Sequence, residues 1–511
     1  MRVLMLGWEF PPHISGGLGT ACQGMTQGLA HQGVEVLFVI PRAMGDEDKR
    51  SAQVLGCNEV PIARFRRPSK AARGAVDGRR TSQGVHADGT TVVEKVVTRK
   101  AGAKGSKTIA PDVPVETLLE LLEIDSPLRP YLDAEIYEKV VTELKSTSKT
   151  QEAASEQPSE ETRISSETME AVRELRALLQ PDLASSVDAA SPSTPQGAQY
   201  LSFSGQYGPD LFAEVARYAI VVGEIARREK FDVIHAHDWM TFPAGIVASR
   251  ISKKPLVCHV HACEYDRSGE NIDTRIRGLE QLGVDYADRI VPVSHYTASV
   301  LRRRYGAPSD KLRVVHNAVT HNEQIEEIRW QKNIEEPIVL FLGRVTFQKG
   351  PDYFIEAAAR VLKVEPNVKF VMSGSGDMLP RMIERAARLG IARSIHFTGF
   401  LRGPDVERMY AMADLYVMPS VSEPFGISPL EAMALDVPVI VSRQSGVSEI
   451  LKSALKVDFW DVDDLANKIL GLLRYPALSE QLSEEGRDEV RRIRWEASGQ
   501  ALKQVYAELV P

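Results

Sequence analysis

The first forty residues, MRVLMLGWEFPPHISGGLGTACQGMTQGLAHQGVEVLFVI, contain the pattern that decides the fold. Residues 2–7 form a short apolar run, and the glycine-rich loop SGGLGT follows it. An apolar stripe at spacings of four, three and four comes next: Leu18, Cys22, Met25 and Leu29. Such a stripe predicts an amphipathic helix, which ends at Gly33 before the apolar run VEVLFVIP. Strand, helix and strand in this order predict a βαβ unit with a parallel sheet.

Two further series of short apolar strands, with helices between them, follow later in the chain. The first consists of FDVIHAHDW, PLVCHVHA, RIVPVS and LRVVHNAV, and the second of PIVLFLGRVTFQKG, VKFVMSGSGD, SIHFTGF, DLYVMPS and VPVIVS. Strands that alternate with helices are typical of parallel sheets covered by helices. We therefore predict an α/β fold with two Rossmann-like, doubly wound domains that face each other across a cleft.

The predicted domain boundaries lie where this alternation stops and resumes. Residues 1–62 and 201–320 form the two parts of an N-terminal Rossmann-like domain, 63–200 an insertion, 321–490 a C-terminal Rossmann-like domain, and 491–511 a helix that crosses back.

The insertion 63–200 has segregated charges. Residues 64–107 carry twelve Lys and Arg against three Asp and Glu, whereas residues 151–170 carry six glutamates against one arginine. Such composition predicts a largely disordered segment. The basic tract could instead bind nucleic acid or an anionic surface, but the overall net charge of −7 gives no support to nucleic acid as a partner.

Composition and cysteine usage indicate an intracellular protein. A hydrophobic content of 43% is sufficient for large cores. The N-terminal apolar run is too short to span a membrane and lacks a cleavage site, so we expect no transmembrane segment and a cytoplasmic location. The four cysteines lack metal-ligand spacing and are expected to be free thiols: Cys22, Cys57, Cys258 and Cys263.

Polar residues gather at the carboxyl ends of the predicted strands, where ligands bind in open α/β sheets. His235 and His237 point to one face of their strand, and His259 and His261 repeat the same spacing on a later strand. A metal site and a set of buried structural histidines both fit this pattern.

The segment GRVTFQKG places Arg344 and Lys349 five positions apart, directly after a predicted strand. Guanidinium and ammonium groups bind phosphate oxygens. The pair could therefore neutralise a diphosphate without a metal ion, although two solvated loop cations would give the same pattern.

The segment SVSEPFGISPLEAMALDVPVIVS, residues 420–442, places Glu423 and Glu431 eight positions apart. Ser428 followed by proline and then by Glu431 predicts a helix start with a capping box. Gly426 lets the backbone approach a neighbour closely, and two carboxylates around a helix start also suit a ligand that is both anionic and hydroxyl-rich, such as a nucleotide sugar. Capping and ligand binding both remain open at this point.

Two other motifs are weak. The loop HISGGLGTA has Cys22 where a dinucleotide-binding loop needs its third glycine, so a dehydrogenase is disfavoured. The two Asp-x-Asp pairs, Asp46 with Asp48 and Asp461 with Asp463, lie in a charged run and at a predicted helix start. Neither pair is placed to hold a metal-bound diphosphate.

Four motifs in this order, the Gly-Gly loop, DVIHAHDW, GRVTFQKG and EPFGISPLE, resemble those of retaining glycosyltransferases with two Rossmann-like domains (GT-B), families 4 and 5, which include glycogen and starch synthases. The resemblance covers residues 1 to about 62 and 205 to the end. It implies transfer of a hexosyl group, glucosyl in the synthases, from a nucleotide-diphosphate sugar such as ADP-glucose or UDP-glucose to a glucan or another hydroxyl acceptor. It also implies a donor site in residues 321–490 and no metal or other cofactor.

The resemblance implies a role for each matching residue. In the catalytic group, His237 would face the sugar and Glu423 would contact the transferred sugar. Arg344 and Lys349 would bind the diphosphate. The donor-binding group would be Gly16, Gly17, Phe425, Gly426, Ile427, Ser428, Leu430 and, on the ribose, Glu431. The acceptor side would be Asp238, His261 and Glu264.

The chain also departs from the family pattern. Ser15 stands where glycogen synthases of family 5 usually carry a lysine, and the insertion has no counterpart, so the acceptor is left open. Alternatives are a transferase of cell-envelope polysaccharide or glycolipid synthesis, a phosphorylase or epimerase on the same fold, and a non-catalytic nucleotide-sugar-binding protein. The pattern predicts no oligomeric state.

Overall fold

The computed structural model describes residues 1–13, 17–61, 200–208, 211–320, 332 and 334–510. Gly16 and nearly all of the predicted insertion 63–200 therefore lie outside the described residues.

The first half of the molecule contains a parallel sheet in the order β3-β2-β1-β4-β5-β6. Its strands are β1 (Arg2–Leu6), β2 (Glu35–Ile40), β3 (Gln53–Gly56), β4 (Val233–His237), β5 (Leu256–Val260) and β6 (Arg289–Pro292). The helices of this half are α1 (Gly17–His31), η1 (Cys57–Glu59), α6 (Leu211–Arg228), α7 (Phe242–Ser252), α8 (Glu264–Ser268), α9 (Thr274–Tyr286) and α10 (His295–Tyr305).

The second half contains a parallel sheet in the order β12-β11-β10-β7-β8-β9. Its strands are β7 (Ile338–Leu342), β8 (Lys369–Ser373), β9 (Ile395–Gly399), β10 (Leu415–Met418), β11 (Val439–Ser442) and β12 (Leu455–Val457). The helices that the structure describes after β7 are η3 (Phe347–Lys349), α12 (Pro351–Val361), α13 (Leu379–Arg388), α14 (Pro404–Met412), α15 (Ser428–Ala434), α16 (Val447–Ile450), α17 (Val462–Arg474), α18 (Pro476–Val490) and α19 (Trp495–Ala507).

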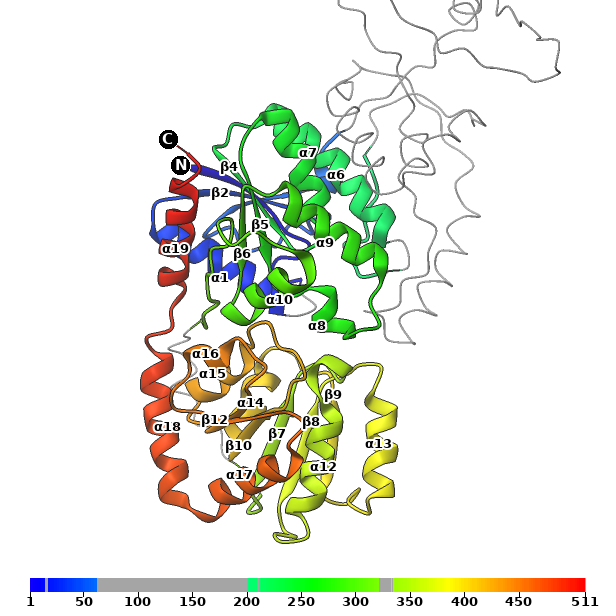
Figure 1. Cartoon of the computed structure of the whole chain (residues 1–511), viewed down its shortest axis with the longest axis vertical. Helices are drawn as coiled ribbons and strands as arrows, with labels where there is room; N and C mark the ends of the chain where they lie inside the picture. Colours follow the sequence, from blue (N-terminus) through cyan, green and yellow to red (C-terminus); the bar gives the residue numbers. More distant parts are fainter. Residues whose placement is uncertain (14–16, 62–199, 209–210, 321–331, 333, 511) are drawn as a thin grey trace, which may run out of the picture.

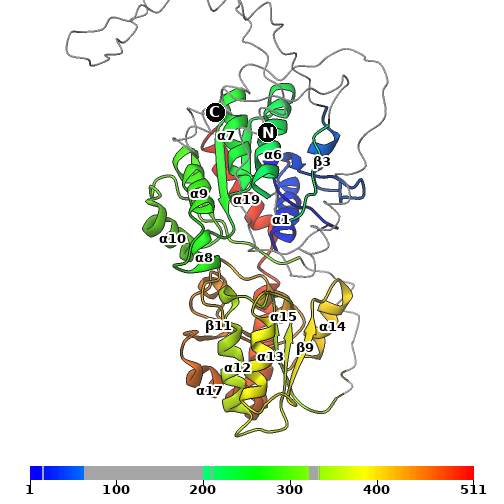
Figure 2. The same cartoon turned by 90° about the vertical axis from the view of Figure 1, so that its right-hand side faces the viewer.

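Helices cover both faces of each sheet, because side chains on a strand alternate between faces. In β1, Leu4 and Leu6 pack in the core beneath α6 and α7, whereas Val3 and Met5 pack in the core beneath α1 and α19. Figure 1 shows the two halves one above the other, with α19 beside α1, and Figure 2 shows the same layers from the side. The predicted fold of two doubly wound Rossmann-like units is confirmed.

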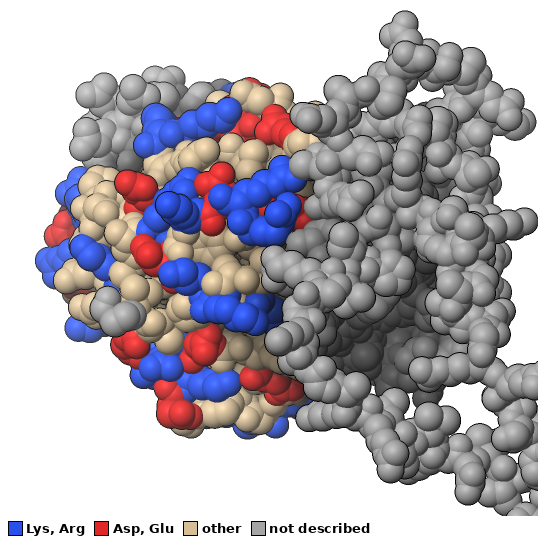
Figure 3. All heavy atoms as spheres, turned by 90° about the horizontal axis from the view of Figure 1, so that it is seen from above, with Lys and Arg blue, Asp and Glu red and all other residues tan. Residues whose placement is uncertain are grey.

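The last helix crosses back to the first half, where α19 packs against α1. Small residues permit this close approach, since a Cβ atom on Gly499 would lie 2.2 Å from the carbonyl carbon of Gly28. Among the helices that the structure describes, none has the length and apolar character needed to cross a membrane. Figure 3 shows basic and acidic side chains intermingled over the described part of the upper end of the molecule.

The prediction of a strand in LRVVHNAV is wrong, because this segment forms only an isolated bridge between Ile290 and Leu312. It follows the edge strand β6 through two hydrogen bonds and then leaves the sheet, where the carbonyl of His316 accepts a hydrogen bond of 2.7 Å from Ser498 Oγ instead. The short edge strands β3 and β12 were not predicted.

Candidate active site between the two sheets

Two loops at the carboxyl edge of the second sheet bring the predicted donor residues together. One loop follows β7 and contains Arg344 and η3, and the other follows β10 and contains residues 419–427. The loops are neighbours because β7 and β10 are adjacent strands. At their contact, Gly350 has φ +64°, and a Cβ atom there would lie 2.2 Å from the carbonyl oxygen of Pro419. A larger residue would therefore push the loops apart.

Lys349 and Glu423 form an ion pair across these loops, between Nζ and Oε2. The side chain of Glu423 is 8% exposed and that of Lys349 is 20% exposed, so the pair is largely shielded from water. Ser420 Oγ donates a further hydrogen bond of 3.2 Å to the same carboxylate oxygen. The structure thus joins two residues that the sequence singled out separately.

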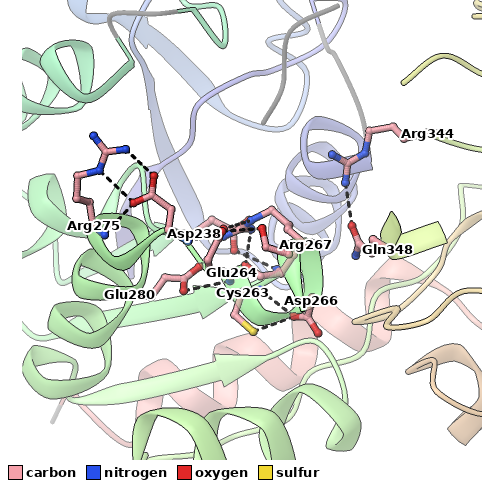
Figure 4. A network of polar contacts seen from close by, with 12 residues as sticks. Asp238, Cys263, Glu264, Asp266, Arg267, Arg275, Glu280, Arg344 and Gln348 are labelled. Carbon is pink, nitrogen blue, oxygen red and sulfur yellow. Dashed lines mark hydrogen bonds and ion pairs between the residues drawn. The ribbon is translucent and has the colours of Figure 1, made fainter. Parts of the chain in front are cut away.

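Arg344 lies on the same loop as Lys349 and donates from Nη2 to Gln348 Oε1 at 3.1 Å. Gln348 is buried, and its backbone carbonyl accepts a hydrogen bond of 2.9 Å from Val421 N of the second loop. Gln348 therefore orients Arg344 and also ties the loops together, a role that sequence reasoning missed although the residue lies inside the quoted motif. Figure 4 shows Arg344 and Gln348 beside the polar cluster of α8.

Glu431 lies in the first turn of α15, and its Oε2 accepts a hydrogen bond of 3.1 Å from the Tyr410 hydroxyl. Burial raises the pKa of Glu431, and the hydrogen bond from Tyr410 opposes part of that rise. The predicted capping box is wrong. Ile427 is the N-cap and has helical backbone angles, so Ser428 is already the first helical residue and no side chain caps the helix.

The remaining predicted donor residues lie between Glu423 and Glu431 along the chain, and they contribute mainly backbone groups. The side chains of Phe425 and Leu430 are buried in the core, so they offer a ligand their backbone only. Gly426 has φ +97° and lies against Met418. This left-handed conformation explains the glycine between the two carboxylates.

Four histidines form a stacked group in the first half: His235 and His237 of β4, His259 of β5, and His261 directly after β5. The first three are fully buried and His261 is half-buried. The centroids of neighbouring rings are 4.4 to 5.1 Å apart, and hydrogen bonds join His235 to His259 at 3.0 Å and His237 to His261 at 2.9 Å. The hydroxyl of Tyr506 on α19 is bonded to His235. Burial lowers the pKa of His235 and His261 to about 3 and that of the other two well below the usual value, so the rings are neutral at pH 7.

The geometry of the histidine group is compatible with both interpretations of the sequence, a metal site and a set of structural histidines. Two sets of potential ligand atoms lie within 4.8 Å of one another: Cys22 with His237 and His261, and His235 with His237 and His259. The buried Nε2 atoms of His237 and His259 have no hydrogen-bond partner within the described part of the chain. The four cysteines are buried free thiols, as predicted.

The predicted acceptor-side residues hold the turns after β4 and β5. Asp238 has φ +59° and accepts a hydrogen bond of 2.7 Å from His261 N, and burial raises its pKa to about 6. Glu264 is committed to hydrogen bonds from the Arg267 and Ser268 side chains. Arg267 also contacts Glu280 at 2.6 Å, and burial raises the pKa of Glu280 to about 7. Their acceptor roles stay predictions.

The glycine loop lies at the start of α1, where Gly17 is exposed. The amide of Gly19 in the first turn of that helix donates to Glu9 Oε1 at 3.1 Å, a contact that the sequence did not predict.

Three family models match successive parts of the chain. They are described as the starch synthase catalytic domain over residues 2–78, Glycosyltransferase Family 4 over 170–323 and Glycosyl transferases group 1 over 324–489. Together with the two parallel sheets, these matches define the class that the chain resembles: its successive parts are each similar to a glycosyltransferase family, and its fold is the GT-B arrangement of two Rossmann-like units.

Curated relatives agree with this class. An uncharacterised glycosyltransferase of Methanocaldococcus jannaschii is 35% identical over 237 residues, and the match spans 44% of this chain but only 60% of that protein. A D-inositol 3-phosphate glycosyltransferase of Catenulispora acidiphila is 29% identical, covering 55% and 71% of the two chains. A glycogen synthase of Mycobacterium tuberculosis is 26% identical, covering 54% and 68%.

Two solved structures share this fold. Sucrose-phosphate synthase from Thermosynechococcus elongatus has a TM-score of 0.57 at 16% identity, covering 99% of this chain and 98% of that one. TarM has a TM-score of 0.58 at 13% identity with the same coverage. At such identities the likeness concerns the fold alone.

Proposed function

We propose that this chain is a retaining glycosyltransferase that moves a hexosyl group, most simply glucosyl, from a nucleotide-diphosphate sugar to a glucan or another hydroxyl acceptor without a metal ion. The observation that carries the proposal is the contact between Lys349 and Glu423 beside Arg344. A lysine and an arginine on one loop beside a shielded carboxylate support a diphosphate site next to a group that can accept hydrogen bonds from sugar hydroxyls.

The cations have a defined task in this reaction. As the bond between the sugar and the diphosphate breaks, negative charge develops on the leaving phosphate. Arg344 and Lys349 would stabilise that charge, an electrostatic effect worth about 3 to 4 kcal/mol for a well-placed group. Glu431, at the start of α15, would accept hydrogen bonds from the ribose hydroxyls.

Retention requires the acceptor hydroxyl to attack the sugar carbon from the face that the diphosphate leaves. The new bond forms to the acceptor oxygen, the bond to the diphosphate breaks, and the acceptor proton passes to a leaving phosphate oxygen. His237 would face the sugar as a neutral imidazole, because burial keeps its pKa well below the usual value.

The test is a donor screen. The purified chain is incubated with UDP-, ADP- and GDP-hexoses, with and without glycogen or a small polyol phosphate as acceptor, and release of the nucleoside diphosphate is measured. NMR of the product gives the anomeric configuration. We expect one donor to be consumed in an acceptor-dependent manner with retention, whereas inversion would contradict the mechanism and tight donor binding without turnover would identify a binding protein.

A further inference from the structure

The loop that carries Glu423 is also held from the first half of the molecule. Ser422 Oγ donates a hydrogen bond of 2.5 Å to Asp266 Oδ1 of α8, and the Tyr296 hydroxyl of α10 lies 2.9 Å from the same Ser422 Oγ. Since the single hydroxyl proton of Ser422 is directed to Asp266, the Tyr296 hydroxyl must be the donor to Ser422. The three side chains form one hydrogen-bonded chain across the two halves.

A second contact holds the residue on the other side of Glu423. The carbonyl oxygen of Pro424 accepts hydrogen bonds from Ser294 Oγ at 2.6 Å and from Thr297 Oγ1 at 3.2 Å. The packing is tight here, since a Cβ atom on Gly446 would lie 2.2 Å from that same oxygen. Both neighbours of Glu423 are therefore fixed by groups at the start of α10 or on α8.

The start of α10 is itself anchored on the second half. Glu449 of α16 accepts hydrogen bonds from the backbone amides of His295 at 2.9 Å and Tyr296 at 2.5 Å. The hydrogen bonds from His316 and from these amides lower the pKa of Glu449, so its carboxylate is ionised at neutral pH. These hydrogen bonds from the backbone amides fix the position of the Tyr296 backbone, from which the side chain reaches Ser422.

We infer that Tyr296, Ser422 and Asp266 are positioning residues for the transferred sugar: Tyr296 and Asp266 act through Ser422 to hold Glu423 in place from the half opposite the predicted nucleotide site. The inference rests on the proposed function, in which Glu423 contacts the sugar. The nucleotide part of the donor is predicted to contact Arg344, Lys349 and Glu431, all on the second half. Loss of the chain should therefore impair use of the sugar and leave nucleotide binding intact.

The first test compares wild type with Tyr296→Phe, Ser422→Ala and the double variant. Two quantities are measured for each: kcat/KM for the donor found by the screen, and Kd for the nucleoside diphosphate (UDP, ADP or GDP) that this donor contains. Tyr296→Phe removes one hydrogen bond and should lower kcat/KM about twofold to tenfold. Ser422→Ala removes that bond and the bond to Asp266, so it should lower kcat/KM at least as much. The diphosphate Kd should stay within about twofold of wild type in both variants. The double variant should lose no more than Ser422→Ala, because the serine substitution already removes the hydrogen bond to Tyr296. Ser422→Thr should retain activity.

The matched control is Tyr265→Phe on α8, since the Tyr265 hydroxyl forms no hydrogen bond within the described part of the chain; this variant should behave as wild type. Fully additive losses, or an equal fall in diphosphate affinity, would overturn the inference.

The second test does not depend on activity. The amides of Val421 and Glu423 are hydrogen-bonded to the carbonyls of Gln348 and Gln444 at 2.9 Å each. Hydrogen exchange at both amides should accelerate in Ser422→Ala and Tyr296→Phe, while exchange in β7 stays unchanged. If wild type consumes none of the donors, the proposed function fails, but hydrogen exchange still tests whether Tyr296 and Ser422 hold the loop that carries Glu423. Unchanged exchange at both amides would refute this positioning role.

Discussion

Replacing Lys349 by alanine should have two separable effects, one on stability and one on turnover. The Glu423 side chain is 8% exposed and contacts the Lys349 ammonium directly. At about 4 Å and an effective dielectric constant of about 20, such a pair attracts by about 4 kcal/mol. Removing the lysine leaves a shielded carboxylate without its cation, a change that typically costs about 3 to 5 kcal/mol of unfolding free energy.

Turnover should fall by about a hundredfold or more in Lys349→Ala, since a preorganised positive charge at the leaving diphosphate is lost. That factor corresponds to about 2.7 kcal/mol of transition-state stabilisation. Arg344→Ala should lower turnover to a similar extent for the same reason.

A second substitution separates the two effects. Glu423→Gln in the Lys349→Ala background removes the unpaired charge, so the double variant should recover much of the lost stability but none of the turnover. The assays are urea unfolding and steady-state release of nucleoside diphosphate. Lys468→Ala is the matched control, because Lys468 pairs with Asp464 on α17 outside the candidate site and should change both quantities little. Wild-type turnover in Lys349→Ala, or turnover that returns together with stability, would refute the assignment.

Three further predictions follow from the same residues. Turnover should survive EDTA, and loss that a divalent metal restores would instead favour metal at the histidine group. Burial lowers the pKa of all four histidines of the group, that of His235 and His261 to about 3 from an unfolded value near 6.5, so the unfolded chain binds more protons in this range and the unfolding free energy should fall as pH drops from about 6.5 towards 3. Asp238 and Glu280, with pKa values raised to about 6 and about 7, and Glu431, whose pKa burial also raises, act in the opposite sense and offset part of this fall. Urea unfolding at pH 7.5, 6 and 5 measures how the unfolding free energy changes with pH. The change should be smaller in His235→Gln, and an unfolding free energy that does not depend on pH in wild type would contradict the prediction. Removal of residues 79–169, which lie between the matched segments 2–78 and 170–323, should leave folding and donor hydrolysis largely intact, since loop closure depends weakly on length, and a variant that fails to fold would show that the segment is structural.

Local patterns were sufficient for the class of fold. Consecutive apolar residues such as Val3, Leu4, Met5 and Leu6 require burial on both faces of a strand, and only a sheet with helices on both sides provides it. The apolar stripe of α1 and the end of this helix just before Gly33, which has φ +69°, could also be predicted from the sequence, because both depend on backbone geometry within a few residues.

The pairing of the site residues was decided only by the tertiary structure. Lys349 and Glu423 are separated by 74 positions and meet because β10 lies next to β7, and the order of strands in a parallel sheet depends on the packing of the whole domain rather than on local sequence.

The helix start at Ser428 was misread for a related reason: the loop before it is set by contacts of Phe425 and Pro424 with distant segments. Sequence periodicity determined that His235 and His237 share a face, but their neutral, stacked state needs the register of β4 beside β5 and the hydroxyl of Tyr506, 271 positions away. Local sequence determines periodicity and turns because those forces act over a few residues, whereas burial, strand order and contacts between the two halves arise only when the chain packs as a whole.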